Sequence, residues 1–161
     1  MTIAAIEAGG TKFVCGLLEA DPGARAARPL ILERASIPTS TPADTLAAVR
    51  DFLAAAAERH GAPECLGIGC FGPAGVRPGS PTWGRVTATP KPGWRNADVA
   101  GFFQAAFGVP VAFDTDVNAA AFGESRWGAA QGLGDFVYLT VGTGIGGGVF
   151  SGGALVHGLS H

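Results

Sequence analysis

The sequence predicts an α/β protein with a mixed sheet of about five strands, flanked by helices and followed by a second hairpin. Short apolar runs typical of strands alternate with segments that carry a helical apolar stripe. Residues 65–71 are apolar on both faces, as in a central strand that is covered on both sides. The 161 residues, of which 47% are hydrophobic, are enough for one well-buried domain.

The first third of the chain is expected to form three sequential antiparallel strands. These strands cover residues 2–7, 12–19 and 30–36, and the tight turn Gly9-Gly10 joins the first two. Three strands that follow one another so closely predict one continuous antiparallel half of the sheet.

Two helices and one long loop occupy the middle of the sequence. Thr41 is expected to cap the first helix, which has Pro42 at its first position and ends at Gly61. A second helix is expected over residues 96–107. Residues 72–95, between the central strand and the second helix, are rich in turn residues. They predict a long ordered loop, which in compact domains is usually functional.

A strand over residues 110–113 leads directly into a helix over residues 117–127, and two carboxylates stand at the junction. The free N–H groups of a helix entrance favour a carboxylate, and a side chain at the carboxyl end of a strand reaches a ligand in the crevice beyond. This placement makes Asp116 a candidate functional residue. The simpler alternative is that Asp114 or Asp116 is only the N-cap of the helix.

Two hairpin turns contain glycine beside threonine. They are Gly9-Gly10-Thr11 and Gly142-Thr143-Gly144, the latter between expected strands at 136–141 and 147–150. Successive backbone N–H groups and threonine hydroxyls hold phosphate oxygens well, so the two turns predict a site for one nucleoside triphosphate. Residues 142–147 also match GxGxxG, but a dinucleotide site needs a helix after the turn, and here a strand follows.

Composition argues against several classes of partner. The net charge is −2 and there is no basic patch, which disfavours nucleic acid. No run approaches the roughly 20 apolar residues of a membrane span, and Met1 leads into a strand without a basic leader, so we expect a cytoplasmic protein with no membrane partner. Cys15, Cys65 and Cys70 lack CxxC spacing and are expected to be buried free thiols.

Several motifs together resemble one family. Residues 6–12 (Ile-Glu-Ala-Gly-Gly-Thr-Lys) look like a first phosphate motif, residues 116–124 like a catalytic segment, and residues 139–148 like a second phosphate motif. Residues 71–75 and 89–94 look like sugar-side loops. The chain thereby resembles the ROK sugar kinases, most of all the bacterial fructokinase branch, over about the first half of the family's usual length. The resemblance implies the ribonuclease-H-like fold of the actin and hexokinase ATPases.

The resemblance also implies an activity, ATP-dependent phosphorylation of a hexose, most similar to conversion of fructose to fructose 6-phosphate, with ATP and Mg²⁺ as cofactors. Asp116 would be the general base, and Glu7 the metal-side carboxylate, although many members of the wider family carry Asp at that position. Asn96 and Asn118 are candidates for binding sugar hydroxyls, because an amide both donates and accepts. The residues implied to line the phosphates are Gly9, Gly10, Thr11, Lys12, Gly142, Thr143 and Gly144. Lys12 is alternatively a solvated strand residue.

Residues 158–161 stand where the family continues into a Glu-x-Gly-His sugar motif and a cysteine cluster that holds structural zinc. We therefore expect an N-terminal ATPase lobe at 1–116, and a linking helix with the first hairpin of an incomplete C-terminal lobe at 117–161. Zinc is expected only in the remaining half, and His161 is more typical of a chain edge than of a metal ligand. The chain alone is expected to be inactive, and to form a homodimer or self-associate through the incomplete lobe.

Two other interpretations stay open. The same family includes sugar-binding transcriptional repressors, which place a DNA-binding helical segment before the first strand, whereas here Met1 begins that strand. The chain is alternatively a catalytically dead fragment of the kinase. In the kinase interpretation the partners are a small sugar and ATP, without nucleic acid or membrane.

Overall fold

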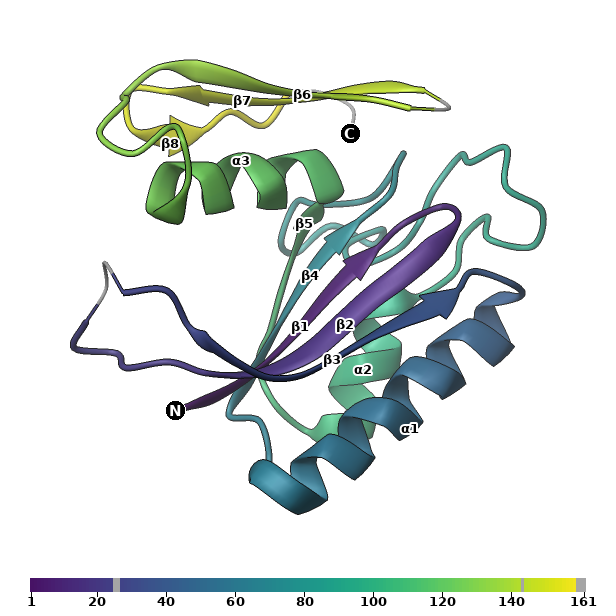
Figure 1. Ribbon diagram of the computed structural model, residues 1–161. Coiled ribbons are helices and arrows are strands. Elements are labelled where there is room, and N and C mark those ends of the chain that lie inside the picture. The colour runs from purple at the N-terminus through teal and green to yellow at the C-terminus, as the bar shows by residue number, and fades with distance from the viewer. Residues whose placement is uncertain (25–26, 143, 159–161) are drawn as a thin grey trace.

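The main sheet has five strands in the order β3-β2-β1-β4-β5 (Figure 1). The computed structural model describes residues 1–24, 27–142 and 144–158. The first three strands are antiparallel, while β4 and β5 run parallel to β1, which confirms a mixed five-stranded sheet. The bounds are β1 (Thr2–Ala8), β2 (Lys12–Glu19), β3 (Leu30–Pro38), β4 (Cys65–Cys70) and β5 (Val111–Thr115).

Helix α1 (Pro42–His60) begins and ends as the sequence predicts. The side chain of its N-cap Thr41 accepts a hydrogen bond from the Asp44 backbone N–H, which satisfies one of the free donors of the first turn. Proline opens the helix, where it loses no hydrogen bond, and the N–H of Gly61 donates to the Ala57 carbonyl at the other end. The helix packs against β2 and β3 of the sheet.

Helix α2 (Val99–Phe107) starts later than the sequence predicts. The expected start at Asn96 is wrong because Asn96 has φ 62°, in the left-handed region that a helix excludes. The cap is Asp98, whose side chain accepts from the Gly101 N–H at 2.9 Å. Asn96 therefore belongs to the long loop before α2.

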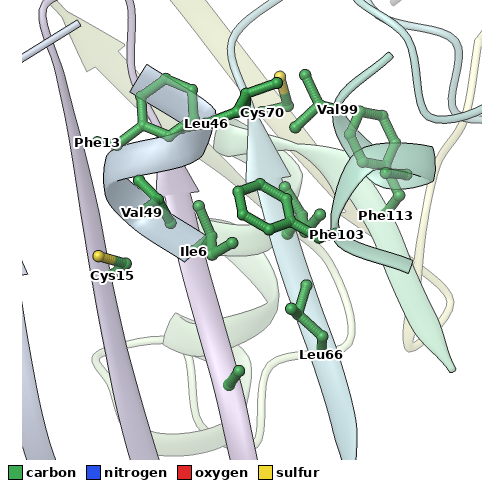
Figure 2. Close-up of a cluster of buried hydrophobic side chains, with 14 of the residues drawn as sticks. Ile6, Phe13, Cys15, Leu46, Val49, Leu66, Cys70, Val99, Phe103 and Phe113 are labelled. Carbon is green, nitrogen blue, oxygen red and sulfur yellow. The ribbon is translucent and has the colours of Figure 1, made fainter. Parts of the chain in front are cut away.

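The core lies between one face of the main sheet and the pair α1 and α2 (Figure 2). Ile6, Cys15 and Leu66 project from the strands towards Val49 of α1 and Phe103 of α2, and all of them are almost inaccessible to solvent. Each buried side chain of this size contributes on the order of 2 kcal/mol through removal of apolar surface from water. The core thus fixes the position of β1, β4 and β5, whose ends carry the candidate site.

The long loop between β4 and α2 is ordered, as predicted. Trp94 is fully buried, and its indole N–H donates to the Ser40 carbonyl at 2.9 Å. Isolated bridges join Ala74 to Val86 and Arg85 to Asp98. The Trp94 bond holds the loop over the N-terminal end of α1, and the bridges order the loop itself.

Helix α3 (Asp116–Trp127) lies between the main sheet and a second sheet, as Figure 1 shows. It starts one residue earlier than expected. The second sheet contains the predicted hairpin, with β7 starting two residues early, and an additional strand that was not predicted. Its strands are β6 (Phe136–Val141), β7 (Ile145–Ser151) and β8 (Ala154–Leu155), all antiparallel.

Glycines allow α3 to approach both sheets closely. A Cβ atom at Gly69 of β4 would lie 2.7 Å from the Ala119 Cβ and 3.4 Å from the Asp116 Cα. On the other side, a Cβ at Gly148 of β7 would lie 2.4 Å from the Val117 carbonyl oxygen. A larger residue at either glycine would displace the first turn of α3.

The face of β4 that points away from α1 and α2 is only partly covered. An open, mainly apolar pocket of about 600 Å³ lies there, lined by small residues such as Gly67, Gly69 and Ala112 and by Phe122 of α3. The expectation of a strand covered on both sides is therefore met in part: α1 and α2 cover one face of the sheet, and α3 packs on the other face of β4 at Gly69. Among the described residues, no helix has the length and apolar content needed to cross a membrane.

The outer face of the second sheet is apolar and exposed. Val141 pairs with Ile145 and Leu139 with Gly147, so these side chains share one face, opposite the face that packs on α3. Leu139 is 65% exposed, Val141 77% and Ile145 79%. An apolar strand face of this kind promotes association with another chain.

We expect the isolated 161-residue chain to self-associate through this outer face. Light scattering on the purified chain should give a mass above that of the monomer. A Leu139→Lys, Ile145→Lys double variant should be monomeric, because charges on the face oppose its burial. A monomeric parent chain would contradict this prediction.

Candidate active site

Three parallel strands end in one row at the same edge of the main sheet. Ala8 of β1 pairs in register with Cys70 of β4, which pairs with Thr115 of β5; we call these three residues the end row. The next residues along the chain are Gly9, in the first predicted phosphate turn, and Asp116. Because neighbouring strands lie about 4.8 Å apart, the outer members of this row, Ala8 and Thr115, are about 10 Å from each other.

Asp116 is the first residue of α3, and its environment raises the pKa of its carboxyl. Burial raises the pKa of Asp116, the negative charge of Glu7 raises it further, and a hydrogen bond from the Val117 N–H, 2.9 Å from Oδ1, opposes both. The N-cap is Thr115, whose Oγ1 accepts from the Asn118 N–H at 3.2 Å. Neither Asp114 nor Asp116 is therefore the cap, and the simpler alternative is wrong.

Glu7 lies on the same face of the sheet as Asp114. Glu7 pairs with Gly69, and Gly69 pairs with Asp114, so a glycine stands between two acidic residues. Glu7 is exposed at the end of β1 and close enough to Asp116 to affect its titration. A carboxylate in this position suits Mg²⁺, which proteins hold through one or two carboxylates together with substrate phosphates. Among the described residues, no three His, Cys, Asp or Glu side chains form a cluster that would hold a metal alone.

The first glycine turn combines one structural glycine with one open glycine. The Gly9 N–H donates to the Lys12 carbonyl, and a Cβ at Gly9 would lie 2.6 Å from that oxygen, so the fold itself requires glycine there. Gly10 has no atom within 4 Å of its Cβ position. Thr39, the residue after β3, fixes the turn, because its hydroxyl donates to the Gly9 carbonyl at 2.8 Å and its N–H donates to the Thr11 carbonyl. Gly10, Thr11 and Lys12 are all exposed.

The second glycine turn is open at both of its described glycines. The Gly142 N–H donates to the Gly144 carbonyl at 2.8 Å, and a Cβ at either residue would meet nothing within 4 Å. Gly142 does not have a positive φ, so the backbone does not demand glycine at that residue. Open backbone of this kind fits the close approach of a phosphate. Thr143 lies outside the described residues. In Figure 1 the β1–β2 and β6–β7 turns are at the same side of the molecule.

The two asparagines predicted to bind sugar lie in different surroundings. Asn118, in the first turn of α3, is 4% exposed, and its Nδ2 donates to Asp114 Oδ1 at 2.8 Å. Asn96 is exposed in the loop before α2, where its backbone carbonyl accepts from Arg85. The described contacts join Asn118 to Asp114 and do not bring Asn96 to either residue.

Sequence reasoning missed His157, which contacts the site from the segment after β8. Its Nε2 lies 2.8 Å from Asp114 Oδ2, although the two residues are 43 positions apart. The following carbonyl, that of Gly158, accepts from Arg77 Nη2 at 3.1 Å. No sequence spacing signals either contact, because both depend on how α3 orients the second sheet.

Cys70 lies in the end row, beneath Asp116. Burial raises the pKa of the Cys70 thiol to about 12, with a contribution from the Asp116 charge. Cys15 and Cys70 are buried free thiols, as predicted, whereas Cys65 is partly exposed. A protonated, buried thiol at this place is part of the packing and not a nucleophile.

Solved structures share this architecture. A ROK family glucokinase from Streptomyces griseus, in complex with glucose and AMPPNP, superposes with a TM-score of 0.79 at 31% identity, covering 99% of this chain and 47% of that one. A ROK family transcriptional regulator, homologous to the E. coli MLC protein, has a TM-score of 0.78 at 19% identity, covering 99% of this chain and 39% of that one. The second likeness concerns the fold alone.

Sequence comparison gives relatives of about twice the length. A fructokinase from Pediococcus pentosaceus is 44% identical over 161 residues, which are 100% of this chain and 52% of that protein. The chain thus spans about half the length of the curated relatives it matches. The model of the ROK family matches residues 3–161, and the chain therefore belongs to the ROK family.

Proposed function

We propose that the complete protein containing these 161 residues is an ATP-dependent hexose kinase, with fructose as its preferred acceptor. The observation that carries the proposal is the sheet edge at which an open glycine turn, the Glu7 carboxylate and the half-buried Asp116 meet. Membership of the ROK family and similarity to a fructokinase support it. The division into lobes at residue 116 is part of this proposal.

Asp116 is the general base in this reaction. Its carboxylate takes the proton from the sugar hydroxyl while that oxygen forms a bond to the γ-phosphorus, and the bond from the γ-phosphorus to the bridging oxygen breaks to leave ADP. Burial suits Asp116 to the role, because a raised pKa makes a carboxylate a stronger base. Phosphoryl transfer otherwise depends on positioning and charge stabilisation.

The open glycines and Glu7 would hold the nucleotide and its metal. Gly10 and Thr11 from one sheet, and Gly142 and Gly144 from the other, offer exposed backbone to phosphate oxygens. Glu7 would be the protein ligand of Mg²⁺, which neutralises phosphate charge when bound. Gly9 has a supporting role, since its place is set by the Lys12 carbonyl.

The sugar-binding repressor interpretation differs in a measurable way, because a repressor would bind the sugar without transferring phosphate. We expect a coupled assay with ATP and fructose to detect transfer by the complete protein. The 161 residues alone are expected to be inactive, because they cover only half the length of the related kinase. Fructose binding without turnover by the complete protein would overturn the kinase proposal.

Replacing Asp116 by Asn in the complete protein should lower kcat at least about a hundredfold, the low end for loss of a general base, with a much smaller change in nucleotide affinity. The matched control is Asp114→Asn, which should cost less because Asp114 already accepts three hydrogen bonds. Steady-state kinetics and a nucleotide titration measure both effects. The assignment is wrong if Asp114→Asn removes activity and Asp116→Asn spares it.

Replacing Gly144 by Val should abolish binding of a nucleoside triphosphate while the far-UV circular dichroism stays that of the parent. A Cβ at Gly144 would have no heavy atom outside its chain neighbours within 4 Å, so a side chain there fills the space that a phosphate needs. Gly134→Val is the control, since that glycine is equally open but lies outside the turn. Isothermal titration on the complete protein measures binding. An unfolded Gly144→Val variant would instead mean that the turn is an ordinary structural one.

Replacing Glu7 by Gln should lower the pKa of Asp116, because a neighbouring negative charge no longer opposes ionisation. Carbon-13 NMR of the Asp116 carboxyl as a function of pH measures the change in the 161-residue chain. The raised folded-state pKa also means that the stabilising contribution of protonated Asp116 is lost as the pH rises through that pKa. Glu19→Gln, at the far end of β2, is the control. An unchanged Asp116 pKa in Glu7→Gln would show that the two carboxylates do not interact.

A further inference from the structure

Asp114 accepts hydrogen bonds from three different parts of the chain. Its Oδ1 accepts from the Thr115 N–H at 2.7 Å and from Asn118 Nδ2 at 2.8 Å, and its Oδ2 lies 2.8 Å from His157 Nε2. In this bond a ring N–H of His157 can donate to the carboxylate oxygen. With both oxygens engaged, Asp114 is a poor candidate for moving a proton.

These bonds fasten the turn of α3 that carries Asp116. The backbone N–H of Asn118 donates to Thr115 Oγ1, while its side chain donates to Asp114. Asn118 is thus held at two points, two residues after Asp116. Because Asn118 is 4% exposed, its amide has no solvent to replace the Asp114 carboxylate as acceptor.

The segment 156–158 is fastened at three points, one of which is Asp114. The Val156 N–H donates to the Val149 carbonyl, His157 bonds Asp114, and the Gly158 carbonyl accepts from Arg77 of the loop after β4. Asp114 therefore connects β5, the first turn of α3 and the segment after β8. Loss of its carboxylate would remove the side-chain bonds from Asn118 and His157 that join these parts at this point.

We propose that Asp114 is a positioning residue that orients Asn118 and holds segment 156–158 against the first turn of α3, so that Asp116 meets the acceptor hydroxyl in the reactive orientation. This rests on the proposed kinase function. The physical reason is that a general base works only in a narrow geometry, and a displacement of about 1 Å costs up to about a hundredfold in rate.

The kinetic test uses Asp114→Ala and Asp114→Asn in the complete protein. We expect Asp114→Ala to lower kcat about tenfold to thirtyfold, with the KM for ATP changed by less than about twofold, because the loss is in the reactive geometry and not in nucleotide binding. Asp114→Asn keeps an oxygen that accepts from Thr115 and Asn118, so it should recover part of the rate. The acidic limb of the kcat profile should persist in both variants, since Asp116 remains the base. A loss as large as that of Asp116→Asn, together with loss of this limb, would overturn the proposal.

The contribution of His157 is tested by a pair of variants. His157→Gln keeps a donor for Asp114 and should have nearly the parent kcat, whereas His157→Ala should be slower. The loss in the double variant Asp114→Ala, His157→Ala should be smaller than the sum of the two single losses, because both substitutions break the same bond. Additive losses in the double variant would overturn the proposed link between the two residues.

Deuterium exchange on the complete protein gives a readout that needs no catalysis. Peptides covering 116–121 and 154–158 should exchange faster in Asp114→Ala than in the parent, while Asp51→Ala, which removes an exposed partner of Arg50, should change neither. Unchanged exchange in Asp114→Ala would overturn the role of Asp114. If exchange is faster in Asp114→Ala but the parent protein transfers no phosphate, the kinase function is overturned, while the anchoring role of Asp114 stands.

Discussion

The close approach of α3 to glycine surfaces on both of its sides is the constraint on which the rest of the structure depends. Gly69 of β4 lies under Ala119 and Asp116, and Gly148 of β7 lies against Val117. A methyl group at either position would overlap α3, and because packed interiors yield little, the helix would have to move. The position of Asp116 relative to both glycine turns therefore depends on two glycines, one in each sheet, that leave room for α3.

Three acidic residues occupy this small region, and their surroundings give them different properties. Glu7 is exposed at the end of β1, Asp114 is engaged by three hydrogen bonds, and Asp116 is half-buried near the charge of Glu7. Such differences are how a site assigns separate roles to chemically similar groups. Glu7 and Asp116 thus remain available to a ligand, while the Asp114 carboxylate is occupied by its hydrogen-bond partners.

Most of the fold was predictable because its signals are local. The Thr41 cap with Pro42, the Gly61 stop and the short turn at Gly9 each depend on neighbours within one turn of chain. The start of α2 was misplaced because Asp98, and not Asn96, supplies the capping side chain. The additional strand β8 has only two residues, too few to give a period.

The candidate site was predictable in its motifs and not in its contacts. Asp116 at a strand end and the glycine turns are visible as residue patterns, and the structure places Gly9 and Asp116 beside one end row. The contacts of Gly69 and Gly148 with α3, and that of His157 with Asp114, join segments far apart in the sequence. Only tertiary packing brings them together, so a single sequence carries no periodic signal for them.

The buried thiol in the end row has a consequence for covalent chemistry. Only a thiolate attacks alkylating reagents or is readily oxidised, and Cys70, in its apolar surroundings beside the Asp116 charge, stays protonated at neutral pH. Reagents of this class therefore reach Cys70 only when β4 separates from its neighbours. The rate at which this sulfur is modified reports the opening of the sheet edge.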